Sequence, residues 1–253
     1  MKLVILGSGN ADHHGGRAGS GCLLCTPDPV LLDFGPGNWI NLARAGVDPV
    51  RVRLVLLTHL HPDHFSDLVP LLFHQSWSLK GKTREPLTVL GPPGTREVIG
   101  GLRRGIPHLG DHGFPIEVRD LESGVFRFGE VLARPVPVPH VEDLRSVAWR
   151  VEGPRGIFVY SGDCRAGEEL VRALEGADLA VVEATCPDDR PYPTHLTAGE
   201  ACEAARRAGV RSLVLTHFSR DWEGRDPEAE CVGRFPGPLR AAVDLMSVEF
   251  GRS

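Results

Sequence analysis

The sequence lacks any long apolar run. No stretch approaches the roughly 20 apolar residues that a membrane-spanning helix needs, so no transmembrane segment is expected. The apolar run at the N-terminus, residues 3–6, is too short for a signal peptide and is typical of a first strand. We therefore expect a cytoplasmic protein without membrane attachment.

The sequence also lacks a linker and an excess of positive charge. Because no Ser/Gly-rich or low-complexity stretch divides the chain, residues 1–253 are expected to form a single domain. Acidic residues outnumber basic ones, 33 to 28, which gives a formal net charge of −5 at pH 7. This balance argues against a surface that coats nucleic acid broadly, although a local basic patch or a bound metal could still attract phosphate.

Cysteine is sparse, with six residues in the chain. Without a secretory signal, a disulfide framework is not expected. Cys22 and Cys25 have the C-x-x-C spacing of a zinc or redox pair. They lie in an apolar, strand-like run, and no second C-x-x-C follows, so two ordinary buried cysteines are the favoured interpretation. Whether Cys22 and Cys25 bind a structural metal stays open.

Apolar runs and turn signals predict many short strands and fewer helices. Strands are expected at about 2–6, 21–25, 29–33, 53–57, 87–90, 130–136, 146–151, 156–160, 178–183, 211–215 and 246–250. Helices are expected at about 38–45, 66–78, 94–104, 167–175 and 197–208. Numerous strands with helices in both halves predict an α/β (α+β) fold with two sheets in the middle and helices outside.

The most informative motif is Thr-His-Leu-His-Pro-Asp-His at residues 58–64, which contains His59, His61, Asp63 and His64. Imidazole and carboxylate are the usual nitrogen and oxygen ligands of zinc and similar metals. The apolar run at 54–57 precedes the motif, so these side chains are expected in a loop at the end of a buried strand. The motif therefore predicts a metal site.

Three more ligand-type residues follow apolar strands further along the chain: His140, Asp163 and His217. One segment also echoes the first motif, because residues 211–217 repeat the outline of residues 53–59 and both end in Thr-His. This echo favours two similar halves whose strand ends meet at one place.

The H-x-H-x-D-H motif, followed in order by His140, Asp163 and His217, resembles the metallo-β-lactamase superfamily. Segments that resemble its ribonuclease Z-like branch lie at 32–37, 183–185, 195–198, 216–219, 235–236 and 244–246. The resemblance implies an αββα four-layer sandwich with the site at one edge of the two sheets.

The resemblance also implies a site with two divalent metal ions. One metal would take His59, His61 and His140. The other would take Asp63, His64 and His217. Asp163 would bridge the two, with a water or hydroxide also between them. Zinc is the default expectation from the ligand types, but manganese or iron can occupy such sites.

The implied activity is that of a phosphodiesterase, an endoribonuclease of the kind that processes the 3′ end of tRNA. Asp63 could orient the hydroxide. Glu183 and His195 would pair so that the imidazole protonates the leaving oxygen, which is general-acid catalysis. The expected partner is a phosphodiester substrate, either RNA or a small molecule, and dimers are common in this branch, so a homodimer is compatible with the resemblance.

One departure keeps other substrates open. Members of the branch that grip tRNA strongly carry a long arm between the residues matched by His140 and Asp163, but only 22 residues separate these two here. A small cyclic or linear phosphodiester, or a lactone or carboxyl ester, is therefore an alternative substrate for the same metal site. A non-enzymatic metal-binding or accessory protein is a further alternative, which the complete ligand set argues against.

Overall fold

Two mixed sheets form the centre of the computed structural model, which describes residues 1–80, 85–109 and 115–251. The first sheet has the order β14 (Ser247–Glu249), β1 (Lys2–Gly7), β2 (Gly21–Cys25), β3 (Val30–Leu32), β4 (Leu54–Leu56), β5 (Leu87–Gly91) and β6 (Ile116–Asp120). The second has the order β13 (Leu239–Ala241), β12 (Leu213–Thr216), β11 (Leu179–Glu183), β10 (Gly156–Tyr160), β9 (Ser146–Gly153), β8 (Val131–Val138) and β7 (Phe126–Phe128).

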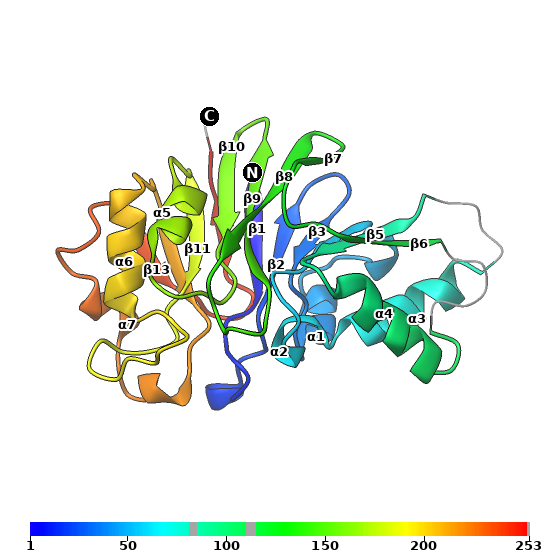
Figure 1. Cartoon of the computed structure of the whole chain (residues 1–253), viewed down its shortest axis with the longest axis horizontal. Helices are drawn as coiled ribbons and strands as arrows, with labels where there is room; N and C mark the ends of the chain where they lie inside the picture. The colour runs from blue at the N-terminus through cyan, green and yellow to red at the C-terminus, as the bar shows by residue number, and fades with distance from the viewer. Residues whose placement is uncertain (81–84, 110–114, 252–253) are drawn as a thin grey trace.

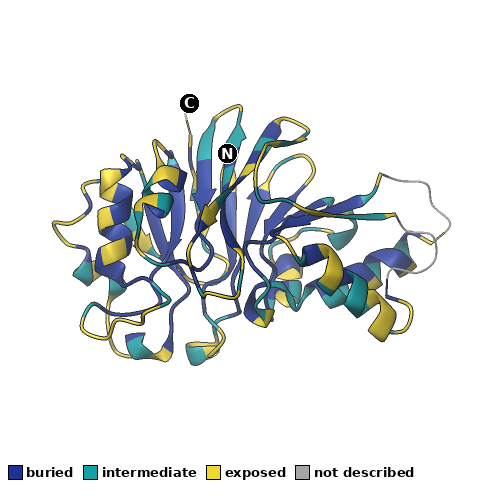
Figure 2. Ribbon diagram, in the orientation of Figure 1, coloured by how far each residue is buried: buried dark blue, intermediate teal, exposed yellow. Residues whose placement is uncertain are grey.

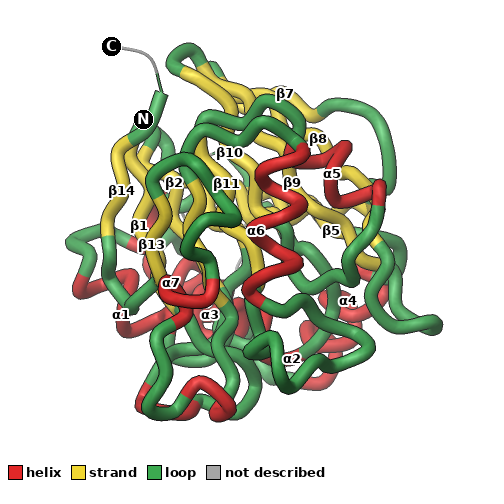
Figure 3. Tube along the Cα trace, turned by 90° about the vertical axis from the view of Figure 1, so that its left-hand side faces the viewer, coloured by secondary structure: helices red, strands yellow, loops and turns green. Residues whose placement is uncertain are grey.

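The helices form the two outer layers (Figure 1). On the side of the first sheet lie α1 (Asn38–Arg44), α2 (Pro62–Phe65), α3 (Leu68–Ser78) and α4 (Thr95–Gly105). On the other side lie α5 (Glu168–Leu174), α6 (Ala198–Arg207) and α7 (Pro227–Glu230). Figure 3 shows α5 and α6 in front of the second sheet, where α6 contacts β11 and β12. This confirms the predicted αββα sandwich.

Alternation along β1 explains the four layers. Leu3 and Ile5 belong to the core between the two sheets, whereas Val4 and Leu6 face the core under the helices of the first sheet. Because successive side chains of a strand point to opposite faces, a strand with apolar residues at every position is buried on both sides. Figure 2 shows this result as buried strands in the middle and helices exposed on their outward faces.

The strands and helices predicted from apolar runs are all present, with small shifts at their ends. Three strands, β6, β7 and β13, and the four-residue helices α2 and α7 were not predicted. β6 and β7 contain no buried residue, and β13 contains only half-buried and exposed residues, so none of the three carries the continuous apolar signal of a buried strand.

The predicted internal pseudo-symmetry is present, but it relates different strands from those expected. In both halves two antiparallel pairings are followed by three parallel ones, from β1 to β6 and from β8 to β13. By this order β4 corresponds to β11 and β5 to β12. The echo between residues 53–59 and 211–217 joins β4 to β12, so these two segments are not equivalent strands.

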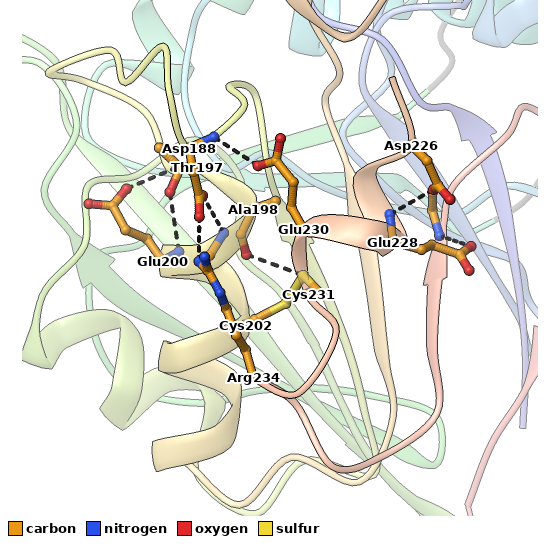
Figure 4. The surroundings of a disulfide bond; sticks show 12 residues. Asp188, Thr197, Ala198, Glu200, Cys202, Asp226, Glu228, Glu230, Cys231 and Arg234 are labelled. Carbon is orange, nitrogen blue, oxygen red and sulfur yellow. Dashed lines mark hydrogen bonds and ion pairs between the residues drawn. A yellow bond between two sulfur atoms is a disulfide. The ribbon is translucent and has the colours of Figure 1, made fainter. Parts of the chain in front are cut away.

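The cysteines depart from expectation in two ways. Cys202 on α6 and Cys231 beside α7 form a disulfide, with Cα atoms 6.2 Å apart and a sequence separation of 29 (Figure 4). The prediction of no disulfide framework missed this bond, because the contact depends on how the C-terminal segment packs against α6. Cys22 is buried but Cys25 is exposed, since residues three apart on β2 face opposite ways.

Candidate metal centre

The predicted site residues meet at the lower edge of the sandwich in Figure 1, where α2 lies. His59, Asp163 and His217 each follow the carboxyl end of a parallel strand, namely β4, β10 and β12. His140 follows β8, and α2 carries Asp63 and His64. Carboxyl ends of parallel strands share one edge of a sheet, so the fold gathers residues that lie far apart in sequence.

Tight backbone packing keeps these strand ends together. A Cβ atom added to Gly35 would lie 1.8 Å from the carbonyl oxygen of Asp63, so only glycine lets the chain after β3 approach α2 this closely. His217 adopts a left-handed backbone with φ of 65°, and so does Asp33, with φ of 53°. Such strained conformations persist where surrounding contacts hold them, and they are common at functional sites.

One group contains His59, His61, His140 and Asp163, whose ligand-type atoms all lie within 4.8 Å of one another. The Nε2 atom of His59 lies 3.1 Å from Nδ1 of His61. Oδ2 of Asp163 lies 3.7 Å from Nε2 of His59 and 3.9 Å from Nε2 of His140. Three imidazoles and one carboxylate oxygen therefore face a common point.

A second group contains Asp63, His64 and His217. Oδ2 of Asp63 lies 3.6 Å from Nε2 of His64 and 3.5 Å from Nε2 of His217. The other oxygen of Asp163, Oδ1, lies 3.3 Å and 3.2 Å from the same two nitrogens. Asp163 thus presents one carboxylate oxygen to each group.

Outward hydrogen bonds fix the orientation of four of the rings. Nδ1 of His140 donates to the carbonyl of Thr194 over 2.9 Å, and Nδ1 of His64 lies 2.7 Å from a carboxylate oxygen of Asp33. Nδ1 of His59 lies 3.0 Å from the hydroxyl of Thr58, and Nδ1 of His217 lies 2.7 Å from the hydroxyl of Thr185. Each ring is left with Nε2 facing inward.

The inward atoms are suited to a cation. Four inward-facing atoms are buried and have no hydrogen-bond partner in the described part of the chain: Nε2 of His64, of His140 and of His217, and Oδ1 of Asp163. If Nδ1 carries the proton, Nε2 presents a lone pair, and lone pairs facing carboxylate oxygens repel unless a positive charge lies between them. The donor set of imidazole nitrogens and carboxylate oxygens is the one that divalent metals such as zinc take.

The charges of the pocket lead to the same conclusion. Burial lowers the pKa of His64, but Asp163 and Asp33 outweigh it and hold that pKa well above its usual value. Burial raises the pKa of Asp63, but the close approach of His217 and the charges of His64 and His217 lower that pKa to about 2. The site therefore demands positive charge, supplied by a proton on the ring or by a metal in its place.

Next to these groups lies the pair of Glu183 and His195. Glu183 is 1% exposed, and its carboxylate lies 3.1 Å from Nδ1 of His195. Burial lowers the pKa of His195, but the hydrogen bond and charge of Glu183 outweigh it and raise that pKa to about 9. The His195 side chain is 18% exposed, so this charged imidazole is accessible from the solvent side of the site.

Comparison with known proteins identifies the family. Residues 29–218, which are more than half of the chain, match the family described as Beta-lactamase superfamily domain. The chain belongs to this superfamily. It is 30% identical to a protein named Ribonuclease Z from Mycobacterium sp. (strain KMS), over 98% of this chain and 96% of that protein. It is 34% identical to a Mycobacterium leprae protein named Uncharacterized protein ML1173, over 96% of this chain and 86% of that protein.

Solved structures of the superfamily show the same fold. The metallo-beta-lactamase fold protein YhfI from Bacillus subtilis superposes with a TM-score of 0.83 at 22% identity, over 98% of each chain. Human tRNase Z, short form, superposes with a TM-score of 0.80 at 23% identity, over 98% of this chain and 99% of that one. These likenesses confirm the predicted αββα architecture of the superfamily.

All the residues predicted for the site lie together in the structure, but three supporting residues were given no role by the sequence. Asp33 accepts hydrogen bonds from the backbone nitrogen and the hydroxyl of Thr58, and its carboxylate contacts His64. Thr185 contacts Glu183, His195 and His217. The available signal was positional, because each of the three follows the end of a buried strand.

Proposed function

We propose that this protein is a metal-dependent phosphodiesterase of the ribonuclease Z type that uses two divalent metal ions, most simply zinc. The observation that carries the proposal is the position of Asp163, whose two carboxylate oxygens face two separate groups of ligand-type residues. We assign His59, His61 and His140 to one ion, and Asp63, His64 and His217 to the other. Asp163 would offer one carboxylate oxygen to each ion.

The chain's own residues have three roles in this proposal. When bound, the metal pair polarises a phosphoryl oxygen and lowers the pKa of the attacking water. Asp63, with its low pKa and slight exposure, accepts a hydrogen bond from that water and orients it. His195 donates its Nε2 proton to the leaving oxygen, while Glu183 holds the opposite nitrogen and favours the charged ring.

RNA is the proposed substrate because relatives that match nearly the whole chain carry the name Ribonuclease Z. A small phosphodiester is the second candidate, and a specific observation favours it. Between His140 and Asp163 the chain forms β9 and β10, joined by the two residues 154–155, which leaves no room there for a tRNA-gripping arm.

Cytoplasmic location, a single domain and a homodimer remain predictions. No helix in the described ranges is long and apolar enough to cross a membrane.

The test combines metal content with activity. Elemental analysis of the purified protein should give about two metal ions per chain, and the protein should cleave precursor tRNA or bis(p-nitrophenyl) phosphate. Asp163→Ala should lose metal and nearly all hydrolysis, because it removes a ligand from both ions. Asp48→Ala, an exposed carboxylate at the cap of a short helix, is the matched control and should keep both. A fully active Asp163→Ala protein with two metals per chain would refute the bridging role.

A further inference from the structure

The hydroxyl of Thr185 lies where the two parts of the proposed site meet. It donates a hydrogen bond to Oε2 of Glu183. It lies 2.7 Å from Nδ1 of His217 and 3.3 Å from Nδ1 of His195. Thr185 is 4% exposed, so water does not readily replace these contacts. One buried hydroxyl thus contacts a proposed metal ligand and both members of the proposed acid pair.

Proton counting fixes the direction of these hydrogen bonds. A threonine hydroxyl has one hydrogen and can accept through its lone pairs. Because that hydrogen goes to Glu183, the contact with His217 requires the ring to donate from Nδ1. The ring therefore keeps the Nε2 lone pair, which faces Asp63 and Asp163. The same hydroxyl donates to Oε2 of Glu183, and the Glu183 carboxylate accepts a hydrogen bond from Nδ1 of His195.

Thr58 provides an internal comparison. Its hydroxyl donates to Oδ2 of Asp33 over 2.7 Å and lies 3.0 Å from Nδ1 of His59. Thr58 is thus also a buried hydroxyl between a carboxylate and a proposed ligand ring. It differs in one respect, because the carboxylate that it contacts serves the metal-facing ring of His64 and not His195. Thr58 and Thr185 therefore share the ligand-orienting contact, and only Thr185 contacts the acid pair.

We propose that Thr185 is a positioning residue with two effects: it fixes His217 as an Nε2 metal ligand, and it aligns Glu183 with His195 for proton donation. The inference rests on the proposed function for its second effect. The first concerns metal binding alone. Removing a hydrogen-bond partner of a metal ligand typically costs about 10–100-fold in metal affinity or activity.

The experiment compares Thr185→Val, Thr185→Ser and Thr58→Val in the full-length protein. Zinc affinity is measured by competition with a chromogenic chelator. Turnover is measured on two diesters, one with a p-nitrophenolate leaving group and one with a poorer alkoxide leaving group. Valine keeps the shape of threonine and removes the hydroxyl, whereas serine keeps the hydroxyl.

Each valine variant should bind the zinc ion assigned to the ring that its threonine contacts about 10–100-fold less tightly, which is the ion of His217 for Thr185→Val and the ion of His59 for Thr58→Val. With zinc held saturating, Thr185→Val should lose at least about 10-fold more turnover on the alkoxide diester than on the p-nitrophenyl diester, because only the poor leaving group needs the acid. Thr58→Val should lose turnover equally on both diesters. Thr185→Ser should restore zinc affinity and the turnover ratio.

Three results would overturn the inference: wild-type zinc affinity in Thr185→Val, equal losses on both diesters, or a serine variant that behaves like valine. If Thr185→Val does not fold, judged by circular dichroism, Thr185→Ala is held to the same criteria. A wild-type protein that cleaves neither diester would contradict the proposed function, and the zinc affinities would still decide whether Thr185 orients His217.

Discussion

Asp33 and Ser161 occupy equivalent positions in the two sheets. Each directly follows the third strand of its half, β3 or β10, and each donates its backbone nitrogen to the neighbouring strand, at Leu56 or Val181. Each side chain then accepts a hydrogen bond from a backbone nitrogen, that of Thr58 or Glu183. In the first half the carboxylate is that of Asp33, which follows the third strand and accepts this hydrogen bond. In the second half the carboxylate is that of Glu183, which ends the fourth strand and donates the hydrogen bond from its backbone nitrogen. The two halves therefore build different chemistry from one framework.

This relationship predicts a metal-binding effect for Asp33→Asn. The amide keeps the size of the side chain and can still accept from the backbone nitrogen of Thr58. It lacks the negative charge that Nδ1 of His64 contacts over 2.7 Å. Metal affinity should fall by about 10–100-fold, which is the usual effect of removing such a partner. The measurement is zinc affinity by chelator competition, with Asp48→Asn as the control. Unchanged affinity in Asp33→Asn would contradict a supporting role.

The Glu183–His195 pair predicts a pH dependence with a definite sign. Glu183 raises the pKa of His195 to about 9, so the ring is protonated, and can donate, below that pH. Turnover of a diester with a poor leaving group should therefore fall as the pH rises through the pKa. Bound cations lower this midpoint from about 9, because a nearby positive charge disfavours the imidazolium.

Glu183→Gln checks the assignment of that alkaline limb. The amide removes the charge that stabilises the imidazolium, so the midpoint should move to lower pH in a pH–rate profile at saturating metal. An alkaline midpoint that stays the same in Glu183→Gln would assign the titration to another group.

His195→Ala predicts a dependence on the leaving group. The variant should keep its metal content, because His195 is assigned to neither ion, and it should lose turnover most severely on substrates with a poor leaving group. General-acid catalysis typically contributes about 10²–10⁴-fold, which sets the scale of that loss. Turnover on bis(p-nitrophenyl) phosphate should fall far less. Equal losses on RNA and on the activated diester would exclude a general acid at this position.

The sequence predicts those features of the fold that depend on local pattern. The apolar runs give the buried strands, and the dense motif at 58–64 gives the first ligand-type residues, because both signals are contiguous. The roles of Asp33, Thr58 and Thr185 depend on strand register and on which loops meet at the edge of the sandwich. A single sequence does not contain that information, and the strand echo that it does contain relates β4 to β12 instead of β11.

The disulfide between Cys202 and Cys231 predicts a redox-dependent stability. It joins two positions with a sequence separation of 29, so the loop-closure entropy that it removes from the unfolded chain corresponds to about 3–4 kcal/mol of the free energy of unfolding. The bond also ties the segment at 226–234 to α6, where Glu230 and Arg234 hold Asp188 on the loop that leads to His195 (Figure 4). Urea unfolding with and without a reductant measures the effect, after refolding under each condition because both cysteines are buried. The double variant Cys202→Ala/Cys231→Ala should be as unstable as the reduced protein and should not respond to reductant. A wild-type protein of equal stability under both conditions would show that the bond contributes nothing to folding.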